Sequence, residues 1–446
     1  MSVLKIVPTY MWKNKFSSRR ESSTYLRKSF ETLGPTYIKI GQLIASRGDI
    51  FDDVLVNEMK TLQDRCKPFD SLQVIERNVD FSKFIYVDPE PLASASLSSV
   101  HKAKLVGGGD VVIKVLRPNL RETIESDLND IQKILMLGAL INPSMNEVKS
   151  LVDEWRPFIL EELDLNHEIE NIRRFAGMGE SLEWLRVPGV YADLCSPELI
   201  VMDFIEGARI DQVPPTMDPD LVARTLLTFT FDQVLEYQML HGDPHAGNVL
   251  ITPEGKISYI DYGLCVTFDS STRQKLTMLL RATVERDIDT FYDLLVELDI
   301  IITYGSSTDI KRFLRVFFLY LDRPLDTVDI TVMRDLENGR KFRFSIKWII
   351  FFKSVVCIDG INKTFSQVQL RDVLVNYSNQ KFGDSFDPRG FLTLLTAMPA
   401  SVRTINTGIS LLESTILAEN RKISGDIARL RWFLILVLAA EILQHG

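Results

Sequence analysis

Apolar residues recur every three or four positions through the first part of the chain, which is the spacing of amphipathic helices. Within this part, Leu55, Met59 and Leu62 form a stripe that predicts a helix packed on a neighbouring small lobe or on a partner. The pattern extends from the first residue to about residue 80. It therefore predicts a helical N-terminal extension.

The spacing changes near Phe84 to short runs of small, apolar and β-branched residues, which are typical of strands. Residues 93–105 and 111–116 flank a Gly-Gly-Gly-Asp turn and predict a β-hairpin at the start of a sheet. Helical spacing returns over 121–140 and 148–175, and a further strand is expected at 199–205. A small sheet with two inserted helices follows from this order.

A second hairpin is predicted farther along, where Val249–Ile251 and Lys256–Ile260 flank a Thr-Pro-Glu-Gly turn. Everything after Cys265 has helical spacing. This order of helices, a small sheet and a helical body predicts a two-lobed α+β protein. Ligands favour the cleft between two such lobes. The expected domains are a helical extension over 1–80, a small lobe with inserted helices over 81–206, and a large helical lobe over 207–446.

Composition and charge narrow the class of protein. With 446 residues, 46% hydrophobic and 25% charged, the chain is typical of a folded globular protein and not of a collagen-like or disordered one. A balance of 51 basic and 60 acidic residues gives no overall positive field, so nucleic acid is not an expected ligand. The four cysteines lack metal-binding or redox spacing, which favours a reducing, intracellular compartment.

Two terminal segments bear on membranes. Basic residues crowd the first 28 positions, which indicates either a membrane-surface or targeting segment or a solvated basic helix. The apolar run Trp432–Ala440 has nine residues, whereas a spanning helix needs about 20. A core helix is predicted there, with an interfacial or partner-docking helix as the alternative.

The strongest chemical signal lies around the second hairpin. His241–Asn248 reads His-Gly-Asp-Pro-His-Ala-Gly-Asn, and Asp261-Tyr262-Gly263 follows the hairpin. Phosphoryl transfer needs oxygen ligands that hold Mg²⁺ against phosphates, and a carboxylate that orients or deprotonates the acceptor. Any one fragment could be an ordinary turn, but the three in this order favour a phosphotransfer site.

A second signal lies upstream, where Lys114 occupies a predicted strand after a loop of small residues. This is the context of a lysine that contacts nucleotide phosphates, and one carboxylate from the acidic run 161–170 would orient it. In a regular helix Asp164 and Glu168 share a face, while Glu162 points elsewhere. A surface lysine and a solvated acidic face are the alternatives.

From about residue 25 to about residue 300 the chain resembles the UbiB family of atypical protein-kinase-like proteins, also called AarF-domain kinases. Lys39-Ile40-Gly41-Gln42 is similar to the family's KxGQ motif. Residues 91–101, which read PLASASLSSVH, are similar to the family's alanine-rich loop. Glu162-Leu163-Asp164 resembles the ExD motif. The HGDPHAGN and DYG segments resemble the catalytic and metal loops.

The resemblance implies a two-lobed kinase-like fold, ATP or ADP with Mg²⁺ as cofactors, and a role for each matching residue. Asp243 would be the catalytic-loop carboxylate, Lys114 would contact phosphates, and Glu168 would orient Lys114. The implied metal ligands are Asn248 and Asp261. The implied nucleotide-binding residues are Ala93, Ser94, Ala95, Ser96, Leu97, Ser98, Lys114, Met202, Asp203, Phe204 and Ile205. The implied regulatory residues, which restrict access of protein substrates, are Lys39, Gly41, Gln42, Glu162 and Asp164.

The first hypothesis is thus an ATP-binding, Mg²⁺-dependent kinase or ATPase that supports isoprenoid quinone or related lipid metabolism. The family implies a membrane surface, isoprenoid lipid and quinone-pathway enzymes as partners, in a bacterial cytoplasm or inner membrane, a mitochondrion or a plastid. One alternative is a small-molecule phosphotransferase similar to aminoglycoside and choline kinases. Another is a nucleotide-sensing pseudokinase scaffold without useful turnover.

Overall fold

The fold is described from a computed structural model. The described residues are 18–47, 51, 53–62, 69–141, 145–303, 306–321 and 342–382. The first 17 residues, with part of the basic segment, and the apolar run Trp432–Ala440 lie outside them. Contacts divide the chain between Glu206 and Gly207, so the first unit, up to Glu206, and the second unit, from Gly207, are each described by themselves.

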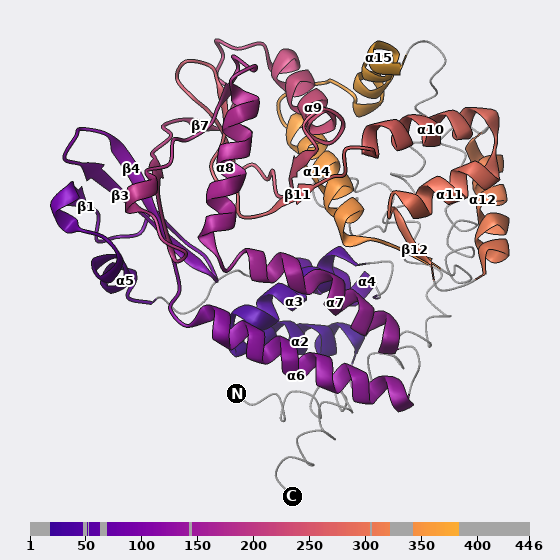
Figure 1. Ribbon diagram of the computed structural model, residues 1–446, viewed down its shortest axis with the longest axis horizontal. Coiled ribbons are helices and arrows are strands. Elements are labelled where there is room, and N and C mark those ends of the chain that lie inside the picture. The colour runs from indigo at the N-terminus through magenta and orange to yellow at the C-terminus, as the bar shows by residue number, and fades with distance from the viewer. Residues whose placement is uncertain are drawn as a thin grey trace, which may run out of the picture. The chain divides into compact units, whose positions relative to one another are not determined.

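The first unit begins with the predicted helices (Figure 1). A capping box starts α2, because Ser18 accepts from the backbone N–H of Glu21 and the Glu21 carboxylate accepts from the N–H of Ser18. The stripe of Leu55 and Met59 packs against residues of α2 and α3. This stripe therefore helps to build the core of the extension itself. The bounds are α2 Arg19–Leu33, α3 Pro35–Ser46, α4 Asp53–Lys60 and α5 Ser71–Asn78.

A five-stranded antiparallel sheet follows, with the main order β1-β3-β4-β6 and β2 paired to β3. The first predicted hairpin is confirmed as β3–β4, in which His101 pairs with Ile113 and Val100 with Lys114. Gly108 adopts φ 95° in its turn, a backbone region that favours glycine. The strands are β1 Phe84–Val87, β2 Ala93–Ser94, β3 Ser98–Leu105, β4 Asp110–Leu116 and β6 Leu199–Asp203.

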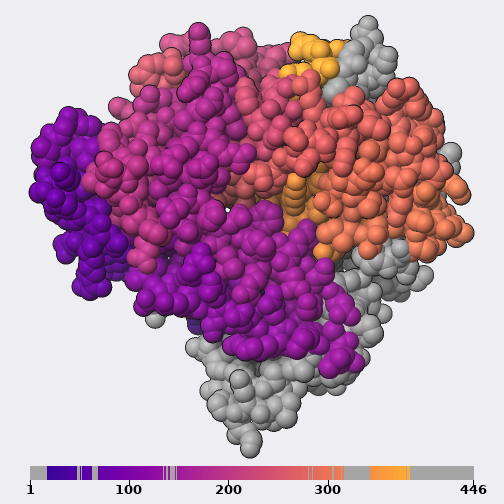
Figure 2. All heavy atoms as spheres, viewed as in Figure 1, coloured from indigo at the N-terminus to yellow at the C-terminus, as the bar shows by residue number. Residues whose placement is uncertain are grey.

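Strand β1 forms an edge of this sheet. Its side chains of Ile85 and Tyr86 are 62% and 52% exposed. The neighbouring Phe84 points into the core with Ile113 and Val201. Figure 2 shows this edge of the first unit at the molecular surface, in indigo.

The helices inserted into the sheet are confirmed, but the single helix predicted over 148–175 is wrong. The helix ends at Glu161, and α8 begins only at Leu165 because Asp164 caps it by accepting from the backbone N–H of Asn166 at 3.0 Å. Aspartate favours this position because its short side chain reaches the first N–H groups of a helix. Asp164 therefore does not share a helix face with Glu168. These helices are α6 Leu120–Ile141, α7 Met145–Glu161 and α8 Leu165–Gly179, and the short elements of this unit are η1 Phe81–Lys83, β5 Leu185–Arg186 and η2 Ala192–Leu194.

The second unit begins with strands around one long helix. The second predicted hairpin is confirmed as β9–β10, with Gly255 at φ 80° in its turn. Strand β8 pairs with β11 so that His241 lies opposite Cys265. The elements are β7 Ala208–Arg209, α9 Pro219–Leu235, β8 Met239–His241, β9 Val249–Ile251, β10 Ile257–Tyr259 and β11 Cys265–Thr267.

The rest of the second unit is mostly helical, yet the prediction of helices alone after Cys265 is wrong. Strands β11, β12 and β13 have three residues each, too few for an alternating pattern to stand out in the sequence. The apolar run around Trp348 forms α14, which is buried as predicted. No helix of the described residues is long and apolar enough to cross a bilayer. The elements are α10 Thr272–Glu285, α11 Ile288–Glu297, β12 Ile301–Thr303, α12 Ser307–Leu321, β13 Phe342–Phe344, α14 Ile346–Asn362 and α15 Leu370–Phe382.

Candidate functional site

A buried ion pair occupies the first unit. Lys114 lies in the middle of β4, paired with Val100 of β3 and Ile200 of β6, and its Nζ lies 2.8 Å from the carboxylate of Glu168 on α8. The two side chains are 9% and 2% exposed. Charges this far from water must be compensated, so each group depends on the other. The structure thus brings Lys114 together with Glu168, the carboxylate that the family resemblance implies as its partner.

A second ion pair joins the N-terminal extension to the segment before α8. Lys39 of α3 donates to the carboxylate of Glu162, and the side chains are 15% and 19% exposed. Gly41 has a packing reason of its own, because a Cβ there would lie 3.2 Å from a ring carbon of Phe30. Asp164, from the same predicted motif, caps α8 instead of facing Lys39.

The loop of small residues is tied down by an arginine that the sequence analysis missed. The backbone N–H of Arg117 donates to the carbonyl of Leu97 at 2.8 Å, and its Nε donates to the carbonyl of Ser96 at 3.3 Å. The guanidinium also stacks over the Phe69 ring, 4.7 Å from its centroid. Ala93, Ser94 and Ala95 are exposed, whereas Ser96 and Leu97 are buried. The exposed half of the loop is the part that could cradle a phosphate.

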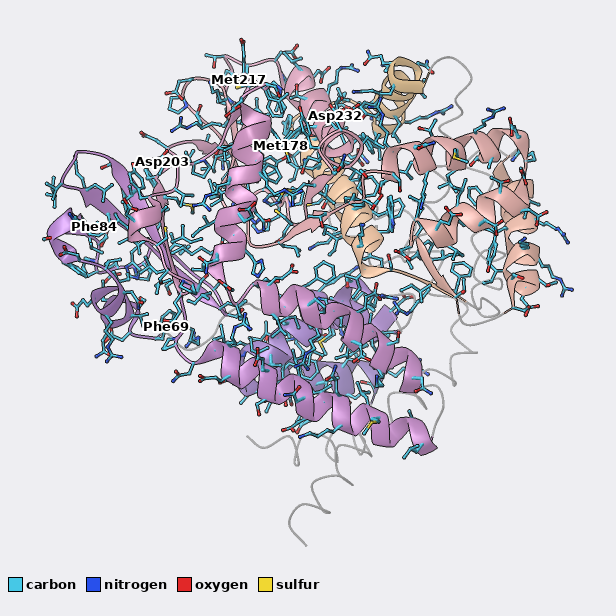
Figure 3. All side chains as sticks on the ribbon, viewed as in Figure 1. Phe69, Phe84, Met178, Asp203, Met217 and Asp232 are labelled. Carbon is cyan, nitrogen blue, oxygen red and sulfur yellow. The ribbon has the colours of Figure 1, made fainter. Side chains whose placement is uncertain are left out.

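The predicted hinge residues divide into two kinds. Met202 is buried in β6, and Asp203 lies at the end of that strand (Figure 3). The Asp203 carboxylate accepts from the backbone N–H of Gly189 at 2.9 Å and from the Tyr191 hydroxyl at 3.1 Å. Arg186 adds an ion pair at 3.1 Å. The Asp203 side chain therefore holds the segment before β6.

In the second unit, His241 connects the two loops that the sequence singled out. It is 1% exposed, its Nε2 lies 2.6 Å from the Asp261 carbonyl, and its Nδ1 accepts from the backbone N–H of Asp243 at 3.3 Å. A carbonyl can only accept, so Nε2 carries the proton. Burial lowers the pKa of His241 and keeps the ring neutral, which this pair of hydrogen bonds requires.

Asp243 carries the exposed carboxylate of this loop, at 39% exposure. Burial alone would raise its pKa, but the ammonium of Lys353, 3.1 Å away, and the nearby imidazole of His245 outweigh that effect, so the pKa of Asp243 lies below its usual range. The carboxylate is therefore ionised at neutral pH. It is suited to orient an acceptor hydroxyl or water more than to hold an abstracted proton.

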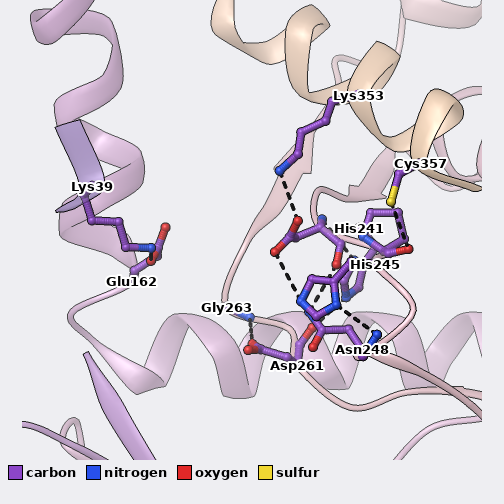
Figure 4. A network of polar contacts seen from close by, with 12 residues as sticks. Lys39, Glu162, His241, His245, Asn248, Asp261, Gly263, Lys353 and Cys357 are labelled. Atoms are coloured by element: carbon purple, nitrogen blue, oxygen red, sulfur yellow. Dashed lines mark hydrogen bonds and ion pairs between the residues drawn. The ribbon is translucent and has the colours of Figure 1, made fainter. Parts of the chain in front are cut away.

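Asn248 and Asp261 are brought together by the β9–β10 hairpin (Figure 4). The backbone N–H of Ile260 donates to the Asn248 carbonyl at 3.0 Å, and the Asn248 Nδ2 donates to the Asp243 carbonyl at 3.1 Å. Asp261 Oδ1 accepts from the N–H of Gly263 at 3.0 Å. With the amide nitrogen turned to the loop, the oxygen of Asn248 is the atom that would face a cation.

This donor set fits magnesium completed by phosphate oxygens. Mg²⁺ commonly binds through one or two protein carboxylates, with phosphate oxygens and waters filling the other positions. In the part of the chain that the structure describes, no cluster of three or more His, Cys, Asp or Glu side chains could hold a metal. One carboxylate and one amide oxygen on adjoining loops match the magnesium pattern and not that of a closed zinc site.

Lys353 is the functional candidate that the sequence analysis missed. It donates to Asp243 from α14, 110 residues away in the sequence. The sequence showed it only as an interruption of the apolar run 348–357. A charged residue in the middle of an apolar helical run points to a charged partner beside the helix, and this was the signal that could have identified Lys353.

The comparisons with known proteins identify the family of this chain. The model of the ABC1 atypical kinase-like domain matches residues 61–295, more than half of the chain. The chain belongs to the ABC1 atypical kinase-like family. Membership in this family, whose relatives carry the names UbiB and aarF-domain kinase, confirms the resemblance and the α+β kinase-like fold.

Individual relatives of this ABC1 atypical kinase-like chain come from bacteria and plants. A Clostridium pasteurianum protein named for the hydrogenase 1 5' region is 29% identical, over 82% of this chain and 72% of that protein. The probable protein kinase UbiB of Pseudomonas putida is 28% identical over 81% of this chain and 71% of its own. Protein ACTIVITY OF BC1 COMPLEX KINASE 8, chloroplastic, of Arabidopsis thaliana is 29% identical over 68% of this chain, which spans only 42% of that protein.

Among solved structures, the complex of Rv3197 with erythromycin from Mycobacterium tuberculosis aligns over 80% of this chain and 94% of that one. The identity is 22% and the TM-score 0.48. This likeness is too distant to bear on function.

Proposed function

We propose that this chain is an ATP-binding, Mg²⁺-dependent kinase or ATPase of the UbiB type. The observation that carries the proposal is the arrangement around His241, which ties Asp243 and Asp261 to one neutral imidazole. Asn248 joins them through the hydrogen bond from its amide to the Asp243 carbonyl. Phosphoryl transfer requires oxygen ligands for the metal and an ionised carboxylate that orients the acceptor, and these groups lie here on adjoining loops.

Each residue of the candidate site has a defined role in this proposal. Asn248 and Asp261 would hold the metal, which when bound neutralises charge on the phosphates. Lys114, oriented by Glu168, would contact the phosphates of the nucleotide. The ionised carboxylate of Asp243 would accept a hydrogen bond from the acceptor hydroxyl or water and so fix its direction of attack.

The Lys39–Glu162 ion pair favours the UbiB type over a small-molecule phosphotransferase. It joins the N-terminal extension to the segment that resembles the ExD motif, both within the first unit. A phosphotransferase similar to aminoglycoside kinases has no need of this extension. This feature supports water as the acceptor, with the access of protein substrates restricted.

Nucleotide binding is tested by the thermal shift that ATP produces with and without Mg²⁺. We expect MgATP at about 100 times its Kd to raise the Tm by about 3 °C, because a ligand bound only to the native state stabilises it by about 2.7 kcal/mol. Asp261→Asn should lose the part of the shift that depends on Mg²⁺, and Lys114→Met should lose the whole shift, each measured against the Tm of the same variant without ligand. Metal-independent binding, or none, would contradict the proposal and favour a nucleotide-sensing scaffold or another function.

The setting is also part of the proposal: we place this activity in isoprenoid quinone or related lipid metabolism at a membrane surface. The name UbiB of one relative and the resemblance of the motifs support this setting. We expect vesicles that contain cardiolipin or other anionic lipids to raise the rate of ATP hydrolysis several-fold over neutral phosphatidylcholine vesicles, through attraction of basic side chains. Equal rates with both kinds of vesicle would count against the membrane setting and leave the nucleotide chemistry untouched.

A further inference from the structure

One face of α14 contacts the loop that carries Asp243. Ile350, Lys353, Ser354 and Cys357 are spaced three, four and seven positions from the first of them, which places all four on the same side of a helix. Ser354 Oγ donates to the carbonyl of His241 at 3.2 Å. The other three meet the residues that follow His241.

Each of the four positions from His241 to Pro244 has a counterpart on this face. Lys353 Nζ lies 3.1 Å from the carboxylate of Asp243, and Cys357 Sγ lies 3.6 Å from the carbonyl of Pro244 (Figure 4). A Cβ on Gly242 would lie 2.9 Å from a methyl carbon of Ile350, so the loop can approach the helix this closely only with glycine there. The contacts of α14 therefore fix the position of this part of the loop; we call the helix the template.

The template is itself anchored at both ends within the second unit. Trp348 Nε1 donates to the carbonyl of Leu298 at 2.7 Å, and Asn362 Nδ2 donates to the carbonyl of Ala223 at 3.0 Å. Trp348 and Phe351 also pack edge to face, with ring centroids 5.6 Å apart. A helix fixed in this way can hold a side chain in one place.

Stability does not explain why a lysine occupies this helix. Its partner Asp243 is 39% exposed and Lys353 itself is 31% exposed, so water screens the pair. Ion pairs of this exposure contribute about 0–1 kcal/mol, whereas an apolar residue at the same place would add buried surface. Because stability does not account for the lysine, its contact with Asp243 points to a role at that carboxylate.

We propose that α14 completes the phosphotransfer site and that Lys353 is a positioning residue for Asp243. This inference rests on the proposed function, and it adds an element that lies outside residues 61–295, the stretch that the family model matches. Lys353 engages Oδ1 of the carboxylate, and Oδ2, which lies 3.8 Å from Nε2 of His245, is the oxygen that would orient the acceptor. Without the ammonium, an exposed carboxylate rotates among several directions and spends less time in the productive one.

The test replaces Lys353 with methionine, which keeps the length of the side chain and removes the ammonium. We expect kcat for ATP hydrolysis to fall by about 10- to 100-fold, the loss typical of a misplaced group, with the Kd of MgATP within about twofold of wild type. Lys353→Arg, which restores a cationic donor, should recover most of the rate. Lys347→Met is the matched control: it makes the same change on the same helix, where Lys347 stacks over Phe268, and it should leave kcat unaltered.

A double-mutant cycle separates positioning from packing. If Lys353 acts through Asp243, Lys353→Met should have no further effect on kcat once Asp243→Asn is present. An equal fall in both backgrounds, or a kcat of Lys353→Met within twofold of wild type, would overturn the inference.

Hydrogen exchange gives a readout that does not depend on activity. In the protein without nucleotide, the amides of residues 241–248 should exchange faster in Lys353→Met than in Lys347→Met, and equal rates would overturn the inference. If wild-type hydrolysis is absent, or is unaltered by Asp243→Asn, the proposed function fails. The exchange comparison still decides whether Lys353 holds the loop.

Discussion

Glu168→Ala should lower the free energy of unfolding by about 3–5 kcal/mol, which is the cost of removing one partner from a buried ion pair. Lys114 is 9% exposed and would lose the carboxylate 2.8 Å from its ammonium. The loss is measured by urea or guanidinium unfolding at neutral pH. Glu170→Ala is the matched control, because Glu170 lies two positions along α8 with its side chain exposed, and it should change stability by less than about 0.5 kcal/mol.

A second variant tells whether the pair is kept for stability or for binding. Replacing both partners with apolar residues, as in Lys114→Met with Glu168→Leu, removes two buried charges together and is often neutral or stabilising. We expect this double variant to recover most of the stability that Glu168→Ala loses, and to show no thermal shift with MgATP. A double variant that still responded to MgATP would contradict the role of Lys114 in phosphate binding.

The pairing of Lys114 with a carboxylate of the run 161–170 could be predicted from the sequence because both the strand and the acidic helix have local sequence patterns. Lys114 follows a loop of small residues within a β-branched run, and the carboxylates fall in a helical pattern. The family resemblance selected Glu168 from this run, and in the structure Glu168 is the carboxylate that contacts Lys114. The break before α8 was missed because periodicity continues across Asp164, whose capping bond is a local contact that hydrophobic spacing does not register.

Long-range contacts mark the limit of what the sequence could predict. Lys353 contacts Asp243 only because α14 packs against the loop that carries Asp243, 110 residues earlier in the chain. The spacing of apolar residues does not predict that packing. The same holds for Arg117, whose bonds to the small-residue loop depend on the register of β3 and β4. The short strands β12 and β13 pair with each other across about 40 residues and have too few residues for a pattern. In each case tertiary packing supplies the information.

The loops around His241 show the opposite situation. Their residues lie close in the sequence, and the hairpin between them fixes which backbones adjoin, so the motif alone predicted that Asn248 and Asp261 would come together. What it did not predict is the state of each group. The neutral His241 follows from burial, and the lowered pKa of Asp243 follows from the nearby Lys353 and His245. The sequence identified the residues, and the structure determines their charges.

Asp261→Asn should reduce kcat for ATP hydrolysis by about 10³-fold with little change in the fold. Asparagine keeps an oxygen that can accept from the backbone N–H of Gly263, as Asp261 Oδ1 does at 3.0 Å, so the loop loses a charge and not its hydrogen bond. The lost charge is the carboxylate that would bind Mg²⁺, and removal of one well-placed electrostatic group from a phosphotransfer site costs about 10²–10³-fold or more in rate.

The measurement is steady-state hydrolysis over a range of Mg²⁺ concentrations, with Asp211→Asn as the control. Asp211 lies in the same unit and pairs with Arg209 at 2.7 Å, so the same substitution there tests for a general effect of removing a negative charge. We expect Asp211→Asn to keep its turnover, and excess Mg²⁺ to raise the rate of Asp261→Asn only in part. Because the fold is expected to persist in both variants, near-normal turnover by Asp261→Asn would mean that the DYG segment does not hold the metal, and the ligand would have to be sought elsewhere in the chain.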